Sequence, residues 1–246
     1  MKIIQNLDFK EYLKIDRLSA SSLMKISKDP ALYHYSKIFK QNDTQSLNFG
    51  RKLHLALLEE EKFSSLEIAK TATTMKEGFI GKLEYEYIKE IKRILKLNSV
   101  LNSAFSSDSK SEVSILWEYE DVKLKSRLDL VRINKNAGFI LDIKSTSHDN
   151  ERDIYKSIKD YRYDIQCQTY IKALKSAYKD LKEVLFWFLF IQKQPPFRVF
   201  VVQMETDLDH EFQIAIENYK NLPTMDEISK SNVKFLSQGE GYAYYC

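Results

Sequence analysis

The periodicity of the hydrophobic residues changes at Glu112, and this change restricts the fold more than any other feature of the sequence. Before Glu112, apolar residues recur three and four positions apart, as they do on one face of a helix. After it, apolar and polar residues alternate over residues 113–117 and 122–133, and an Asn- and Gly-containing turn leads into an apolar segment at 139–144. This alternation predicts a meander of strands. A chain that combines both patterns is predicted to form a mixed α/β domain.

The same periodicities place the remaining elements. Helices are expected after a serine-rich start at 19–22 and over 49–62, 81–97 and 164–178, with a surface loop at 103–111. The longest apolar run, 184–191, predicts a buried strand over 183–192, followed by a strand at 197–204 after the Pro195-Pro196 turn. No internal repeat and no Pro/Gly-rich linker interrupts the sequence, so residues 1–246 are predicted to form a single domain.

Composition excludes several classes of protein. Hydrophobic residues make up 43% and charged residues 30% of the 246 residues, while 6 Gly and 4 Pro argue against collagen-like or disordered chains. No apolar run approaches the ~18 residues of a membrane helix and the N-terminus lacks a signal-peptide core, so we expect a cytoplasmic protein with no membrane partner. Two cysteines exclude a disulfide framework and a four-cysteine cluster. The net charge of +3 does not decide for or against a nucleic-acid partner.

Charged residues at the end of the third predicted strand are the strongest functional signal. Asp142 and Lys144 are two positions apart and share one face of a strand, and Asp129 on the preceding strand can meet them. A D-x-K tripeptide alone fits a surface salt bridge, but apolar neighbours place these charges at the rim of a buried strand. A bound Mg²⁺ would explain converging carboxylates, and Lys144 could polarise water or stabilise phosphate charge. Glu112 is either a further carboxylate of this site or a solvated residue at a loop end.

Other candidates are less distinctive in isolation. His54 lies on a helical stripe with Gly50 and Leu58, where a histidine is more often a core residue than a ligand. Gln166 and Tyr170 are one helical turn apart and face the same way, as many pairs at the edge of a core do. Seven basic residues could line a phosphate groove or remain solvated charges: Arg17, Lys25, Lys28, Arg127, Lys156, Lys159 and Arg162.

Taken in order along the chain, these residues resemble the PD-(D/E)xK nuclease superfamily, and within it the C-terminal nuclease domains of the RecE (exodeoxyribonuclease VIII) family and its phage relatives. The resemblance covers about residues 18–204. It rests on these segments in this order: Gly50-Arg51-Lys52-Leu53-His54, Glu112-Val113-Ser114, Arg127-Leu128-Asp129, Asp142-Ile143-Lys144-Ser145-Thr146, and Tyr161-Arg162-Tyr163-Asp164-Ile165-Gln166 with Tyr170. The last segment favours the RecE family over other members. Leu128 replaces the proline of the superfamily name, and the sequence lacks a helicase P-loop.

The resemblance implies a restriction-endonuclease-like core, a mixed β-sheet flanked by helices. It also implies Mg²⁺ or Mn²⁺ held by His54, Asp129, Asp142 and the backbone carbonyl of Ile143, with Lys144 as the catalytic lysine. Gln166 and Tyr170 match a Q-x-x-x-Y motif that supports the active site and contacts DNA, and Glu112 matches an acidic residue before the core. The serine-rich helix start is similar to a segment that binds a terminal phosphate in lambda exonuclease. Expected DNA-binding residues are Ser21, Arg17 and Arg162.

The activity implied by the resemblance is that of a metal-dependent deoxyribonuclease, most simply a 5′-to-3′ exonuclease on linear duplex DNA in phage-type recombination. The alternatives are an endonuclease or nickase on the same core, a DNA-binding protein that does not cleave, and a structural protein whose acidic hairpin pairs with surface lysines. By analogy with the family, the partners are duplex DNA, a single-strand-annealing recombination protein, and further copies of this chain in a ring that threads DNA.

Overall fold

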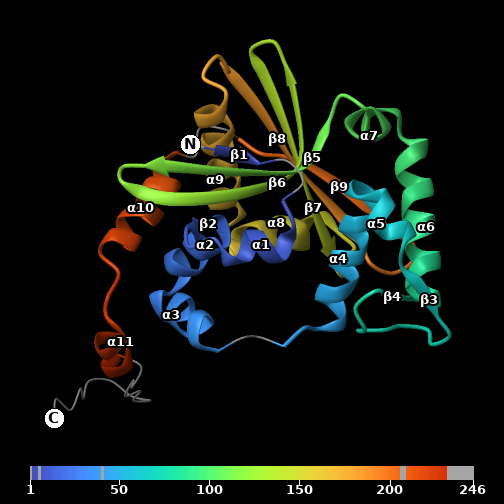
Figure 1. Cartoon of the computed structure of the whole chain (residues 1–246), viewed down its shortest axis with the longest axis horizontal. Coiled ribbons are helices and arrows are strands. Elements are labelled where there is room, and N and C mark those ends of the chain that lie inside the picture. Colours follow the sequence, from blue (N-terminus) through green and yellow to red (C-terminus); the bar gives the residue numbers. More distant parts are fainter. Residues whose placement is uncertain (1, 5–6, 40–41, 206–208, 232–246) are drawn as a thin grey trace.

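A mixed sheet forms the centre of the fold (Figure 1). The computed structural model describes residues 2–4, 7–39, 42–205 and 209–231. Within these residues the main sheet has seven strands, in the order β1-β5-β6-β7-β8-β9, with β2 paired to β6. Its strands are β1 (Lys2–Ile4), β2 (Leu18–Ser19), β5 (Lys110–Tyr119), β6 (Val122–Asn134), β7 (Ala137–Thr146), β8 (Glu183–Gln192) and β9 (Val199–Gln203). The fold class predicted from the sequence, a mixed sheet flanked by helices, is confirmed.

Helices cover both faces of this sheet (Figure 1). One face is packed by α2 (Ala20–Lys28), α3 (Pro30–Ile38), α8 (Glu151–Tyr161), α9 (Tyr163–Ala177) and α10 (Asp209–Lys220). The other is packed by α4 (Gln45–Leu58), α5 (Glu60–Ser64), α6 (Lys82–Leu97) and α7 (Ser99–Ala104). The remaining elements are α1 (Phe9–Lys14), α11 (Met225–Ser231) and a small sheet of β3 (Glu67–Ala69) and β4 (Phe79–Gly81). Of the helices described, none is both long and apolar enough to span a bilayer.

The sequence of β8 explains why it lies inside the sheet. Phe186, Phe188 and Phe190 alternate with other apolar residues, so this strand buries one set of side chains against each layer of helices. The phenylalanines belong to the cluster beneath α9, while Leu189 and Ile191 belong to the cluster beneath α4. A strand buried on both faces is typical of parallel pairing, and β8 pairs in parallel with β7.

The meander is confirmed as the antiparallel strands β5, β6 and β7, and the buried strand over 183–192 as β8. The helix expected at 49–62 is wrong in its bounds. It begins at Gln45, where Thr44 accepts a hydrogen bond from the Leu47 amide, and it breaks at Glu59, whose backbone leaves the helical region. The loop expected at 103–111 instead contains the end of α7 and the start of β5.

Helix α8 was not predicted from the sequence. Its residues are mostly charged, and its apolar face towards the core consists mainly of Ile154 and Ile158, one turn apart. The helix is also well defined at its ends. The Asn150 side chain accepts a hydrogen bond from the Asp153 amide at 3.0 Å, and Arg162 takes a left-handed conformation (φ 59°) that ends the helix and leads into α9.

Candidate active site

Asp142 lies in a buried group of polar side chains at the sheet surface below α9. Its side chain is nearly inaccessible, and its two oxygens have different partners. Oδ2 lies 2.5 Å from Lys144 Nζ, and Oδ1 accepts a hydrogen bond of 2.8 Å from the Gln166 side-chain amide. Asp142 and Lys144 therefore share a face of β7, as strand alternation predicts, and α9 supplies the third member of the group.

A second group forms around Asp129 on β6. Its Oδ2 accepts a hydrogen bond of 2.7 Å from the Ile143 amide, and His54 Nδ1 lies 3.6 Å from the same oxygen. His54 reaches this point from α4, and its Nε2 is 3.0 Å from the Ile143 carbonyl oxygen. Because a carbonyl can only accept, Nε2 carries the proton of this hydrogen bond, and Nδ1 presents its lone pair towards Asp129. A lone pair that faces a carboxylate is unfavourable unless a cation lies between them.

Glu112 joins this group through an unusual backbone. Its φ is 52°, a left-handed conformation that is uncommon for a glutamate, and it lies opposite Asp129 between two regular register pairs of β5 and β6. The ligand atoms of Glu112, His54 and Asp129 all lie within 4.8 Å of one another. Arg127 forms a buried ion pair with Glu112 and donates a hydrogen bond of 2.6 Å to the Leu7 carbonyl. Arg127 is thus held inside the protein, and its predicted place in a phosphate groove is not supported.

The electrostatics of these side chains indicate excess negative charge at Asp129. Burial, together with the charge of Asp142, raises the pKa of Asp129 well above its usual range. Burial and the charge of Asp129 also raise the pKa of Glu112, although Arg127 opposes this rise. Burial lowers the pKa of Lys144, but the charges of Asp142, Tyr163 and Asp129 and the hydrogen bond to Asp142 together outweigh that effect, so the net shift is upward. Lys144 is therefore positively charged, and its charge is matched to Asp142.

These residues fit a divalent cation. Burial lowers the pKa of His54, which favours the neutral form that can bind a metal. Its lone pair and the two carboxylates beside it form a set of nitrogen and oxygen ligands, and a cation among them would offset the repulsion that raises the pKa of Asp129. The most compact group is thus His54, Glu112 and Asp129. The set implied by the family resemblance, His54, Asp129, Asp142 and the Ile143 carbonyl, shares two residues with this group and stays a prediction.

The other predicted residues lie at varying distance from this centre. Tyr170 follows Gln166 by one turn of α9, and burial with the charge of Asp142 raises the pKa of its phenol. Ser21 is exposed in the first turn of α2. The guanidinium of Arg17 donates to the Trp117 carbonyl at 2.9 Å, and that of Arg162 bonds Ser27, Asp164 and Glu211. No contact of Ser21, Arg17 or Arg162 with Glu112, Asp129 or Asp142 is found within the described part of the chain.

Sequence reasoning did not identify Tyr163 or the role of Gly50. The ring of Tyr163 lies beneath Lys144, whose Nζ is 4.9 Å from its centre. The sequence signal for Tyr163 is its position three residues before Gln166, because residues three apart are neighbours on one face of a helix. A Cβ added at Gly50 would lie 2.9 Å from Ser145 Oγ, so this glycine lets α4 approach the end of β7 closely.

The sequence matches a family described as a PDDEXK-like domain of unknown function, DUF3799, over residues 18–239. The chain belongs to this family. The DUF3799 chain is also 27% identical to Kelch-like protein 15 of Mus musculus and of Rattus norvegicus over 170 residues, which are 69% of this chain. Those residues amount to 24% of the length of these curated relatives, so the chain spans about a quarter of each.

Two solved structures were aligned with the DUF3799 chain. A crystal structure of a candidate exonuclease from Eubacterium rectale aligns with a TM-score of 0.61 and 16% sequence identity, covering 94% of this chain and 89% of the other. A phage-related exonuclease from Haemophilus somnus 129PT aligns with a TM-score of 0.43 and 16% identity, over 90% of this chain and 99% of the other. At this level of identity, the first similarity shows a shared fold.

Proposed function

We propose that the DUF3799 chain is a metal-dependent deoxyribonuclease that hydrolyses phosphodiester bonds. The observation that carries this proposal is the pairing of Lys144 with Asp142 beside a second group, Asp129, His54 and Glu112, whose ligand atoms lie within 4.8 Å of one another. A salt bridge for stability alone would need only Asp142 and Lys144. In the second group Arg127 balances Glu112, but the buried carboxylate of Asp129 has no lysine or arginine partner among the described residues, which is costly unless a ligand supplies a cation.

The side chains of the site have different roles in the proposed hydrolysis. His54, Glu112 and Asp129 would hold Mg²⁺ or Mn²⁺. Asp142 and the Ile143 carbonyl would be further ligands. The metal, when bound, supplies Lewis acidity that lowers the pKa of a water and offsets charge on the phosphate. The Lys144 ammonium would orient the attacking water and stabilise negative charge that develops on the phosphate oxygens. Gln166 fixes the Asp142 carboxylate, which in turn fixes the lysine.

Within this class we favour a RecE-like 5′-to-3′ exonuclease on linear duplex DNA in phage-type recombination. The family description and the exonuclease fold support this choice over other hydrolases. The same proposal includes a role for Ser21, Arg17 and Arg162 in binding DNA and for Tyr170 beside Gln166. A single-strand-annealing partner, a ring of subunits, a single domain over 1–246 and a cytoplasmic location remain predictions.

A cleavage assay on two forms of one DNA tests the proposal. The purified chain would be incubated with a linear duplex labelled at its 5′ ends and with the closed circular form, each with Mg²⁺ and with EDTA. We expect release of label from the linear form only, dependent on Mg²⁺. Cutting of the circle would instead favour the endonuclease alternative.

Two variants connect that activity to the site. Asp142→Ala should abolish cleavage, because it removes the partner of both Lys144 and Gln166. Asp180→Ala, a change at an exposed aspartate after α9, is the matched control and should cleave as the parent does. Asp142→Ala activity equal to that of the control would show that the site has been assigned wrongly, and no cleavage of either DNA with Mg²⁺ or Mn²⁺ would contradict the nuclease itself.

A further inference from the structure

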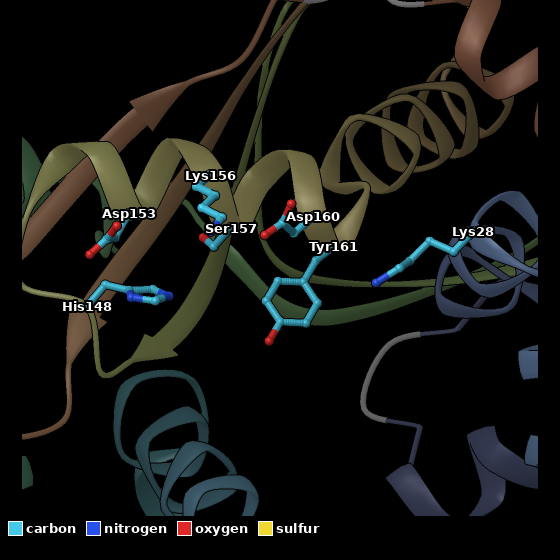
Figure 2. A pocket seen from close by; sticks show the side chains of 7 residues that line it. All are labelled: Lys28, His148, Asp153, Lys156, Ser157, Asp160 and Tyr161. Atoms are coloured by element: carbon cyan, nitrogen blue, oxygen red, sulfur yellow. The ribbon is translucent and has the colours of Figure 1, made fainter. Parts of the chain in front are cut away.

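A groove leads away from Lys144 along α8. A cavity of about 190 Å³ beside Lys144 adjoins a larger one of about 580 Å³, and the two share His148, Ser157 and Tyr161 in their walls. Figure 2 shows the larger cavity from close by, with His148 and Tyr161 on the same side of α8 and Ser157 on the helix between them. The groove therefore begins at the proposed catalytic lysine and extends towards Lys28 on α2.

The smaller cavity has the chemistry of an anion site. Its walls carry the ammonium groups of Lys144 and Lys193 and many hydroxyl groups, including those of Ser46 and Ser145, and no described residue that lines it is a carboxylate. Lys193 is held in place there, because its amide donates to the Thr146 carbonyl at 2.9 Å and its Nζ donates to Ser46 Oγ at 2.6 Å. No ion pair of Lys193 is found within the described part of the chain. Its charge is therefore available to an anionic ligand.

The larger cavity has a different character. Two lysines, Lys28 and Lys156, are balanced in its walls by Asp153 and Asp160, so it offers no comparable attraction for a phosphate. It does offer Tyr161, a large aromatic side chain that is 55% exposed. The ring of Tyr161 stacks on Tyr163 with centroids 5.6 Å apart and an interplanar angle of 23°. The larger cavity therefore suits an uncharged, flat group.

We propose that this groove binds the nucleotide next to the scissile phosphate of a DNA strand, with Lys193 and the neighbouring hydroxyls on its phosphate and Tyr161 against its base. The inference rests on the proposed nuclease function and adds to it a binding site for the strand. The order of the two cavities supports this placement. The phosphate and the base are at opposite ends of a nucleotide, so a phosphate in the smaller cavity beside Lys144 would direct the base into the larger one. An exposed aromatic ring next to a cationic groove is also the usual platform for unpaired bases, since every base has a face that can stack.

Binding measured without catalysis tests the groove. The full chain in EDTA would be titrated into a fluorescein-labelled linear duplex with a single-stranded 5′ overhang, and anisotropy would be followed at several salt concentrations. Tyr161→Ala should weaken binding by about tenfold, while Tyr161→Phe, which keeps the ring, should bind as the parent does. Lys193→Met should weaken binding. It should also reduce the magnitude of the slope of log K against log[salt] by about one.

The chain offers a matched control for each change. Tyr155 is 62% exposed on the same helix but does not line either cavity, and Lys179 is exposed in the connection after α9. Tyr155→Ala and Lys179→Met should bind as the parent does. Affinity in Tyr161→Ala or in Lys193→Met equal to that of its control overturns the inference, and Mg²⁺-dependent cleavage would then still support the nuclease. A parent chain that neither binds nor cleaves DNA overturns both proposals.

Discussion

At the scale of single residues, Asp129 and Asp142 are both buried carboxylates, but their surroundings differ. Asp142 has Lys144 and Gln166 as direct partners, whereas Asp129 has the Ile143 amide and, among the residues that the structure describes, no cation at ion-pair distance apart from His54. Because burial lowers the pKa of His54, this imidazole contributes little positive charge at neutral pH. The unbalanced charge is therefore concentrated at Asp129, where a metal would have its largest effect on stability.

Asp129→Asn should stabilise the metal-free protein. The folded-state pKa of Asp129 is raised, so ionisation destabilises the fold at pH values above the ordinary pKa, and an uncharged amide removes that cost. The amide oxygen can still accept from Ile143. A gain of about 1 kcal/mol would raise Tm in EDTA by roughly 2–4 °C. Differential scanning fluorimetry measures this shift, and the parent chain should gain Tm on adding Mn²⁺ while the variant should not. A lower Tm in EDTA, or a Mn²⁺ shift as large as in the parent, would refute this account.

Gln166 is a positioning residue, because it reaches the site through Asp142. Gln166→Leu should weaken the apparent affinity for Mn²⁺ by about 10- to 100-fold, as the loss of partners behind a metal site often does. The measurement is Tm against Mn²⁺ concentration. Gln168→Leu is the matched control, since Gln168 is also buried on α9 and its Nε2 has no hydrogen-bond partner in the described part of the chain. Equal affinities in the two variants would argue against a role for Gln166.

At the scale of elements, the site depends on where α4 sits against the sheet. His54 is carried by α4, and this helix is tied to α6 by an ion pair of 2.7 Å between Lys52 and Glu84, both nearly inaccessible to solvent. Lys52 Nζ also donates to the Thr74 carbonyl, and Glu84 accepts from the Gly81 amide. The charges are thus fully partnered, which is the condition under which a buried pair is tolerated.

Removing one partner of that pair should be costly. Lys52→Met leaves the Glu84 carboxylate buried without a counterion, and we expect a loss of about 3–5 kcal/mol in the free energy of unfolding. The double variant Lys52→Met with Glu84→Leu should recover part of the loss, because no charge remains buried. Urea denaturation measures both. Lys10→Met, which breaks an exposed ion pair with Glu77, should cause no measurable loss. A single variant as stable as the Lys10 variant would contradict the argument.

Elements rich in apolar residues could be predicted from the sequence, whereas a short and mostly charged helix was missed. Strand alternation correctly predicted the meander, and with it the shared face of Asp142 and Lys144. Helix α8 was missed because most of its residues are charged, although Ile154 and Ile158 face the core one turn apart and caps at Asn150 and Arg162 define its ends. The grouping of Glu112 with Asp129 depends on a positive φ and on strand register, neither of which the pattern of apolar residues records.

At the scale of the whole molecule, the proposed metal ligands connect parts of the chain that otherwise pack separately. The core is divided by the sheet into one cluster beneath α9 and another beneath α4. Asp129 and Glu112 belong to the sheet. His54 belongs to α4, in the helical layer that covers the second cluster. A cation bound to all three would therefore join this helical layer to the sheet.

Hydrogen exchange should reveal that connection. Without metal, amides of β7 and β8 should exchange most slowly, because these neighbouring strands are buried on both faces. The metal binds only when α4 is docked, so Mn²⁺ should lower the population of states in which α4 opens and slow exchange at its amides. Exchange in α11, which carries none of the proposed ligands, should not change. Mass spectrometry of the parent and Asp129→Asn measures both effects. Protection that spreads evenly over α4 and α11, or that persists in the variant, would mean that the cation acts elsewhere.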